Sequence, residues 1–152
     1  FNTDNKSNLE DILKELEKIS KEIKVVFPIH PRTRKRIEEF NLTEYTKGIL
    51  LTEPFDYLSM MGLVQKSLFV ITDSGGLQKE AYFAGKRAIV VMPDTGWREL
   101  TDAGWNLLSK PDEIKSKMDC IVNNEIVPET EHIYGEGNAG RKVVGILSNT
   151  NI

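Results

Sequence analysis

A Ser-Gly-Gly turn is the part of this sequence best suited to bind a ligand. Residues 68–71 are apolar, residues 72–76 read Thr-Asp-Ser-Gly-Gly, and a helical pattern follows at once. The sequence therefore predicts a strand, a tight turn and a helix whose first amides are not covered by side chains at Gly75 and Gly76. Unpaired amides and the positive end of the helix dipole meet at such a turn, so Ser74, Gly75 and Gly76 are suited to hold a phosphate group.

Alternatives to a phosphate site stay open for this turn. Glycine also accepts the backbone angles that turns need, and serine commonly caps helices. The turn is not the Gly-x-Gly-x-x-Gly dinucleotide fingerprint, and no Gly-Lys-Ser/Thr follows it. A Rossmann dehydrogenase and a P-loop enzyme are therefore both poorly supported.

Two further side chains are placed to complete such a site. Glu80 lies four residues after Gly76, on the same helix face, where a carboxylate can accept hydrogen bonds from a vicinal diol such as that of ribose. His30 ends an apolar run and precedes Pro31, and a histidine at the carboxyl end of a strand can bind phosphate or carry a proton near neutral pH. The alternative interpretations are a solvated helix charge for Glu80 and a turn residue for His30.

Composition narrows the class of protein. The chain has 152 residues, of which 39% are hydrophobic and 28% charged, as expected for one domain with a single core. Its net charge of -3 gives no general electrostatic reason to bind nucleic acid or an anionic membrane. The single cysteine, Cys120, cannot form an internal disulfide, so we expect a reducing, cytoplasmic compartment.

No apolar run approaches the ~20 residues of a membrane span, and no cluster of side chains has metal-ligand spacing. We expect neither metal nor cofactor.

Short apolar runs alternate with helical patterns along the chain. The expected strands are residues 24–29, 48–52, 68–71, 88–92 and 105–109. Two helices are expected early in the chain, at residues 8–21 and from the turn at residues 30–33 to residue 40. Further helices are expected after Asp56, after the Ser-Gly-Gly turn, after residue 97, at residues 111–123 and after Asn138. Buried strands that are apolar on both faces imply a mainly parallel sheet with helices on each side, a Rossmann-like three-layer α/β/α sandwich. Ligands of such folds lie beyond the carboxyl ends of the strands, where the turns at residues 30–33, 52–57, 72–76 and 93–98 should gather.

Two helix starts carry specific expectations. Ser7 and Glu10 have the spacing of a capping box for the first helix. Asp56 is suited to cap a helix that buries one face, made of Tyr57, Met60, Met61 and Val64.

Several segments together resemble the C-terminal half of the non-hydrolysing UDP-N-acetylglucosamine 2-epimerases. They are residues 27–34 (Phe-Pro-Ile-His-Pro-Arg-Thr-Arg), 53–57 (Glu-Pro-Phe-Asp-Tyr), 72–81 (Thr-Asp-Ser-Gly-Gly-Leu-Gln-Lys-Glu-Ala), 104–108 (Gly-Trp-Asn-Leu-Leu) and 134–137 (Tyr-Gly-Glu-Gly). They occur in the family's order and spacing from about residue 8 to the end, and the string at residues 72–81 is quite specific.

The resemblance implies one half of a GT-B fold, in which two Rossmann-like domains hold a nucleotide sugar in the cleft between them. Residues 1–152 are then a single UDP-binding C-terminal domain, without the N-terminal domain that carries the catalytic carboxylates. The implied partners are a UDP-sugar and the protein's own N-terminal domain, and a homodimer is left open.

Within that resemblance, Ser74, Gly75 and Gly76 match the diphosphate-binding turn. Glu80 matches the glutamate that binds the ribose hydroxyls, and His30 matches a histidine near the phosphates and the reacting sugar.

Two positions depart from the family pattern. Met60 falls where a family aromatic packs on uracil, and a thioether can also pack on a ring. The family usually has Thr-Glu followed by Arg or Trp within the stretch that corresponds to residues 93–99, whereas this chain has Gly96 in place of the acid. Arg98 is the candidate nucleotide contact in that stretch.

The resemblance implies epimerisation at carbon 2, interconverting UDP-GlcNAc and UDP-ManNAc for cell-surface polysaccharide precursors by elimination and re-addition of UDP. We expect this chain alone to bind UDP weakly and to catalyse nothing. The alternatives are the donor domain of a GT-B glycosyltransferase, which uses a similar turn and glutamate, and a non-catalytic nucleotide-sugar-binding module. Related epimerases act on diacetamido uronic acid derivatives, and residues 104–106 fit that branch at least as well.

Overall fold

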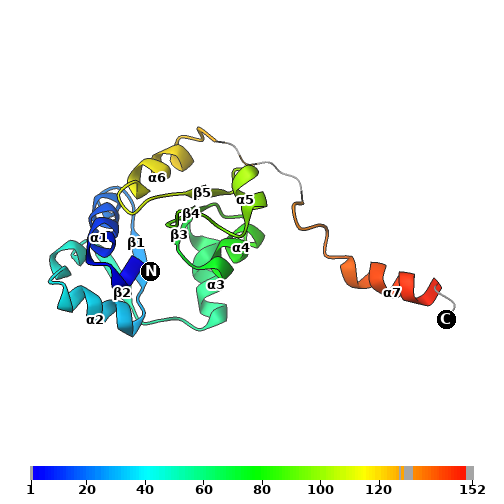
Figure 1. The fold of residues 1–152 in the computed structure, drawn as a ribbon, viewed down its shortest axis with the longest axis horizontal. Helices are drawn as coiled ribbons and strands as arrows, with labels where there is room; N and C mark the ends of the chain where they lie inside the picture. The colour runs from blue at the N-terminus through cyan, green and yellow to red at the C-terminus, as the bar shows by residue number, and fades with distance from the viewer. Residues whose placement is uncertain (1, 127, 129–131, 150–152) are drawn as a thin grey trace.

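Strands and helices alternate along the chain in the computed structural model, which describes residues 2–126, 128 and 132–149 (Figure 1). The strands are β1 (Val25–Pro28), β2 (Ile49–Thr52), β3 (Val70–Thr72), β4 (Ala88–Val90) and β5 (Asn106–Leu108). The α-helices are α1 (Lys6–Ser20), α2 (Pro31–Glu39), α3 (Tyr57–Lys66), α4 (Gly75–Phe83), α5 (Arg98–Asp102), α6 (Ile114–Val122) and α7 (Ala139–Asn149). Two short 3-10 helices are η1 (Asn2–Asp4) and η2 (Thr43–Thr46). Each expected strand and helix is present, with ends shifted by a few residues.

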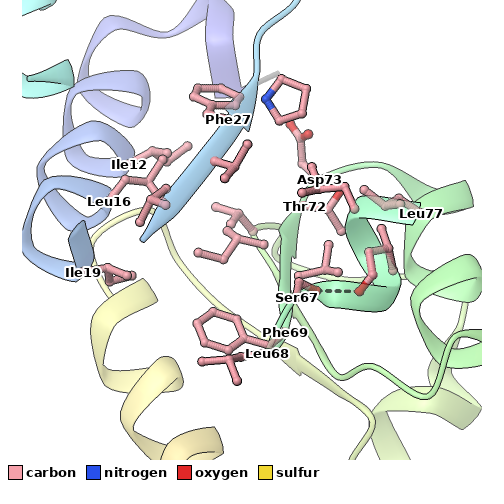
Figure 2. Close-up of a pocket in the computed structure, with 18 of the residues that line it drawn as sticks. Ile12, Leu16, Ile19, Phe27, Ser67, Leu68, Phe69, Thr72, Asp73 and Leu77 are labelled. Carbon is pink, nitrogen blue, oxygen red and sulfur yellow. Dashed lines mark hydrogen bonds between the residues drawn. The ribbon is translucent and has the colours of Figure 1, made fainter. Parts of the chain in front are cut away.

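The strands pair in parallel, as predicted, but they form two sheets. β1 pairs with β2, with Val25 opposite Ile49, and the second sheet has the order β3-β4-β5. The expected single sheet is thus divided between β1 and β3, which do not pair with each other in the described residues. An apolar groove of about 730 Å³ lies between these two strands (Figure 2).

Helices cover both faces of the β3-β4-β5 sheet. Side chains alternate across a strand, so neighbouring residues of β4 enter different cores. Ile89 packs in one core cluster with residues of α1 and α6, while Ala88 and Val90 pack in another with residues of α3 and α4. A third cluster joins α1 and α2 to the other sheet through Leu9, Leu13, Ile29, Ile37 and Ile49. The three-layer α/β/α arrangement is therefore confirmed.

The helix starts differ in part from expectation. Asn5, and not Ser7, caps α1, since its side chain accepts a hydrogen bond from the Asn8 amide at 3.2 Å. Ser7 already lies inside the helix, where its side chain has no first-turn amide to cap. Asp56 caps α3 as predicted, accepting from the Ser59 amide at 2.9 Å. Tyr57, however, is 64% exposed, because it is the first residue of α3 and lies at the end of the helix, seven residues before the buried Val64.

The Asn5 cap gives a direct test of this start. Replacing Asn5 with alanine should lower the free energy of unfolding by about 1 kcal/mol, because an amide of the first turn loses its acceptor. The matched change Ser7→Ala should cost less than about 0.5 kcal/mol, as surface substitutions usually do. Urea unfolding followed by circular dichroism measures both, and a larger cost for Ser7→Ala contradicts the capping by Asn5.

The last helix lies apart from the two sheets. α7 begins directly after Asn138, as predicted, and extends away from the rest of the chain in Figure 1. Its apolar residues Val143, Val144, Ile146 and Leu147 are exposed. Across the residues that the structure describes, no helix is both long and apolar enough to cross a membrane.

Candidate functional site

Three helices follow strands after short turns, and each begins with a polar cap. His30 caps α2 after β1, Asp56 caps α3 after β2, and Ser74 caps α4 after β3. The 3-10 helix η1 connects the first and last of these starts. Asp4 binds Arg32 of α2 through both carboxylate oxygens, at 2.7 and 2.8 Å, and Asn2 donates to Asp73 at 3.2 Å. The predicted gathering of turns at the carboxyl ends of the strands is thus present at α2 and α4.

The start of α4 presents amides that nothing covers. The Ser74 hydroxyl accepts from the Leu77 amide at 3.5 Å, and the Ser74 amide donates to Thr72 Oγ1 at 3.0 Å. The Gly75 and Gly76 amides have no hydrogen-bond acceptor among the described residues, and both glycines are exposed. These amides and the helix dipole make a site at which an anion can be held.

The two glycines are not required by the packing of this turn. A Cβ atom at Gly75 would come no closer than 3.8 Å to Trp97 Nε1, and one at Gly76 no closer than 4.0 Å to Ser74 Oγ. Neither glycine has a positive φ. Alanine therefore fits both positions, and what glycine provides is open space in front of the amides.

Glu80 and His30 are both accessible to a ligand. Glu80 is half-buried and lies one turn into α4, on the face that follows Gly76. His30 is exposed, and its Nδ1 accepts the Arg32 amide at 3.2 Å. Because Nδ1 is an acceptor, a neutral His30 ring carries its proton on Nε2, which is then able to donate to a phosphate oxygen.

Neither Met60 nor Arg98, the two remaining predicted UDP contacts, belongs to the turn at the start of α4. Met60 lines the groove between β1 and β3 together with Thr72 and Asp73. Arg98 is exposed, and its Nη2 donates to Asp94 Oδ2 at 3.3 Å, which leaves the other N–H groups of the guanidinium for further contacts. The pKa of Asp94 is lowered by the hydrogen bond from the Thr95 amide and, second, by Arg98.

Trp97, a residue without a predicted role, contacts the Ser-Gly-Gly turn through its indole ring. Trp97 Nε1 donates to the Gly75 carbonyl at 2.7 Å, and the Lys79 ammonium lies 4.4 Å from the centre of the Trp97 ring. Trp97 therefore fixes the first residue of α4. The sequence feature that could have indicated this role is an aromatic residue in the stretch after the strand at residues 88–92.

Behind Trp97, a tyrosine and a glutamate form a second contact. The Tyr134 hydroxyl donates to Glu99 at 2.7 Å, and the Lys79 ammonium lies 4.1 Å from the Tyr134 ring centre. Burial, followed by this hydrogen bond, raises the pKa of Tyr134 well above its ordinary value. The same hydrogen bond lowers the pKa of Glu99. The motif at residues 134–137 thus folds back onto α4 and α5.

A buried polar network supports the loop that carries Trp97. Gln78 is 1% exposed, and its Oε1 accepts hydrogen bonds from Thr95 Oγ1 at 2.7 Å and from Asn106 Nδ2 at 3.3 Å. The Trp97 amide donates to Thr95 Oγ1 at 3.2 Å. The Gln78 side chain of α4 therefore joins the loop at residues 93–97 to β5. The sequence feature that could have indicated this role is a polar residue inside the string at residues 72–81.

The fold and the turn together define a class. A parallel α/β domain of Rossmann-like type, with helix starts at the carboxyl ends of its strands and open amides at a Ser-Gly-Gly turn, has a geometry that suits a phosphorylated ligand at that edge. Among the described residues, no group of three or more His, Cys, Asp or Glu side chains is arranged to hold a metal ion.

The particular family follows from comparison with known proteins. The UDP-N-acetylglucosamine 2-epimerase family model matches residues 1–148, and the chain belongs to that family.

Relatives and solved structures agree with this assignment. The chain is 37% identical, over 97% of its length, to a UDP-N-acetylglucosamine 2-epimerase homolog from Methanococcus maripaludis. It is 35% identical, again over 97% of its length, to a UDP-2,3-diacetamido-2,3-dideoxy-D-glucuronate 2-epimerase from Pseudomonas aeruginosa. The UDP-GlcNAc 2-epimerase of Methanocaldococcus jannaschii matches 98% of the chain with a TM-score of 0.85 and 31% identity. A structure of that enzyme in complex with UDP-GlcNAc and UDP matches with a TM-score of 0.81.

The matched proteins are much longer than this chain. It spans 42% of the Methanococcus relative, 41% of the Pseudomonas relative and 43% of the Methanocaldococcus structure. The matching part is the C-terminal part of such epimerases, one Rossmann-like half of a GT-B fold.

Proposed function

We propose that residues 1–152 form the UDP-binding domain of a UDP-N-acetylglucosamine 2-epimerase and bind UDP weakly on their own. The observation that carries the proposal is the start of α4, where two exposed amides lie one helical turn before Glu80. The amides suit a diphosphate, and the carboxylate suits the ribose hydroxyls. The UDP named in the Methanocaldococcus complex supports this choice of ligand.

In the proposed reaction, this domain holds the leaving group. When the bond between the sugar and UDP breaks, negative charge develops on the diphosphate, and the Gly75 and Gly76 amides meet it without reorganisation. His30 Nε2 is placed at the same edge as a donor to a phosphate oxygen, which makes His30 the candidate catalytic residue of this chain. We assign the proton transfers at carbon 2 to carboxylates of the other domain, so the isolated chain is expected to show no epimerisation.

The role of Glu80 is tested with a ligand that lacks the ribose diol. Glu80→Gln should raise the Kd for UDP about tenfold, since hydrogen bonds to a charged acceptor contribute about 1.5–3 kcal/mol. The unchanged chain should lose a similar factor on going from UDP to 2′,3′-dideoxy-UDP. Glu80→Gln should bind the two ligands within about twofold of each other, because the diol has lost its partner. An unchanged preference of Glu80→Gln for UDP, measured by NMR titration, argues against the diol contact.

The sugar attached to UDP is proposed as N-acetylglucosamine, with a diacetamido uronic acid derivative as the second candidate. The 37% and 35% identities to relatives of the two kinds are nearly equal, and this favours keeping both. Incubating the full-length protein with each UDP-sugar and no acceptor separates them, because only the true substrate is epimerised. Glycosyl transfer, with no epimerised product from either sugar, would instead identify a GT-B glycosyltransferase.

The setting of the protein is part of the proposal. We place it in the cytoplasm, in the synthesis of cell-surface polysaccharide precursors, with its own N-terminal domain as partner. A homodimer is a further proposal, which sedimentation of the full-length protein tests.

A further inference from the structure

The indole of Trp97 holds the peptide unit that presents one of the two open amides of α4. The Gly75 carbonyl and the Gly76 N–H belong to the same planar peptide unit, in which they point in opposite directions. Trp97 Nε1 donates to that carbonyl at 2.7 Å. The hydrogen bond therefore sets the direction of the Gly76 N–H, which points away from Trp97 and toward the place proposed for the diphosphate.

Few other contacts restrain this peptide unit. Both residues that flank it are glycines, so no Cβ atom limits its rotation. The hydrogen bonds that close the first turn of α4 are long, at 3.5 Å from the Leu77 amide to Ser74 Oγ and at 3.4 Å from the Gln78 amide to the Ser74 carbonyl. The hydrogen bond from Trp97 is shorter than both, so it is the contact best able to fix the peptide unit.

Two further side chains hold the Trp97 ring in place. The Lys79 ammonium lies 4.4 Å from the centre of the Trp97 ring and 4.1 Å from that of Tyr134. The two rings meet edge to face, with centroids 6.4 Å apart and an interplanar angle of 89°. Both arrangements are favourable, since ring faces attract a cation and ring edges attract ring faces. The Tyr134 hydroxyl donates to Glu99 at 2.7 Å. A chain of contacts thus runs from Glu99 through Tyr134 and Trp97 to Gly75.

We propose that Trp97 is a positioning residue for the diphosphate of UDP and that Tyr134 acts through it. Trp97 acts from the protein side of the peptide unit. Its donation to the Gly75 carbonyl also makes the Gly76 N–H a stronger donor, because linked hydrogen bonds polarise one another. An amide that is already oriented loses less freedom when the ligand binds. The inference rests on the proposed UDP site at the start of α4, and it adds side chains from two other segments to that site.

The substitution Trp97→Phe tests the inference, because it keeps an aromatic ring and removes the N–H donor. The quantity to follow is the diphosphate gain, which is the Kd for uridine divided by the Kd for UDP, both from NMR titration. Trp97→Phe should lower this gain about fivefold, as expected for one neutral hydrogen bond, and leave the Kd for uridine within about twofold. Trp105→Phe is the matched control, since Trp105 packs against Tyr82 at 5.0 Å between ring centres, and it should keep the gain.

The outcomes separate this inference from the proposed function. If the unchanged chain binds UDP no better than uridine, the proposed UDP site fails and the inference fails with it. If the unchanged chain shows the gain and Trp97→Phe keeps it, the UDP site stands and the positioning role is overturned. Equal losses of the gain in Trp97→Phe and Trp105→Phe also overturn that role, because a general loosening of the domain would then explain both.

The substitution Tyr134→Phe tests the outer part of the chain of contacts, and it is also informative if Trp97→Phe does not fold. It removes only the hydroxyl that donates to Glu99, and it should lower the diphosphate gain about twofold. Tyr45→Phe is the matched control, because Tyr45 packs against the core cluster of the β1-β2 sheet, and it should keep the gain. The double variant Trp97→Phe/Tyr134→Phe should lose no more than Trp97→Phe alone. A further loss in the double variant, or an unchanged gain in Tyr134→Phe, contradicts the role of Tyr134.

Discussion

Replacing Gly76 with alanine should weaken UDP binding by about tenfold or more, or about 1.4 kcal/mol, while leaving the fold intact. The methyl group would stand in front of the first amides of α4, where we place the diphosphate. Within the protein it would meet nothing closer than Ser74 Oγ at 4.0 Å. Alanine should even stabilise the helix by about 0.4–1 kcal/mol, because it restricts the unfolded chain.

This combination separates a binding role from a structural one. If Gly76 were required for folding, its substitution would lower the stability of the protein. If Gly76 is required for ligand binding, the substitution should lower the affinity for UDP alone. Gly145→Ala is the matched control, since it lies in α7 with no atom within 4 Å of an added Cβ. The Kd for UDP from NMR titration and the Tm are measured for both variants. Unchanged UDP affinity in Gly76→Ala would contradict the diphosphate site.

Replacing Gln78 with leucine should lower the free energy of unfolding by about 3 kcal/mol, because two buried donors lose their acceptor. Those donors are Thr95 Oγ1 and Asn106 Nδ2, at 2.7 and 3.3 Å from Gln78 Oε1. The loop with Trp97 should loosen as well, so UDP affinity should also fall. Denaturant unfolding gives the first quantity and an NMR titration the second.

The control for Gln78→Leu is the same substitution on an exposed helix position. Gln65 of α3 is exposed, and Gln65→Leu should change the stability by less than about 0.5 kcal/mol. Adding Thr95→Val to Gln78→Leu should cost less than the sum of the single changes, because the two side chains share one hydrogen bond. Additive costs would mean that the network does not act as a unit.

Local pattern was sufficient for the elements and for the main turn. Apolar runs identified all five strands, and Asp56 and Ser74 cap the helices that their positions predicted. These features depend on neighbours in the sequence, which is why periodicity and capping rules capture them. The prediction that Ser7 caps α1 is wrong, because two residues suited to cap a helix, Asn5 and Ser7, lie two positions apart and local pattern does not distinguish them.

Features that depend on distant contacts were not predictable in the same way. The Trp97–Gly75 hydrogen bond joins residues 22 positions apart, and Gln78–Asn106 spans 28 positions. No spacing rule shows that a loop after one strand closes over the turn after another. The division of the sheet between β1 and β3 was also missed, because strand patterns show which segments are buried but not which neighbour lies beside them.

The central claim is that the start of α4 holds the diphosphate of UDP. Titrating the ¹⁵N-labelled chain with UDP and, separately, with uridine tests it most directly through the backbone amide shifts. UDP should shift the Gly75 and Gly76 amides strongly and Glu80 with them, whereas uridine should leave the two glycine amides nearly unmoved. Saturable binding of UDP that leaves the Gly75 and Gly76 amides unchanged would contradict the claim.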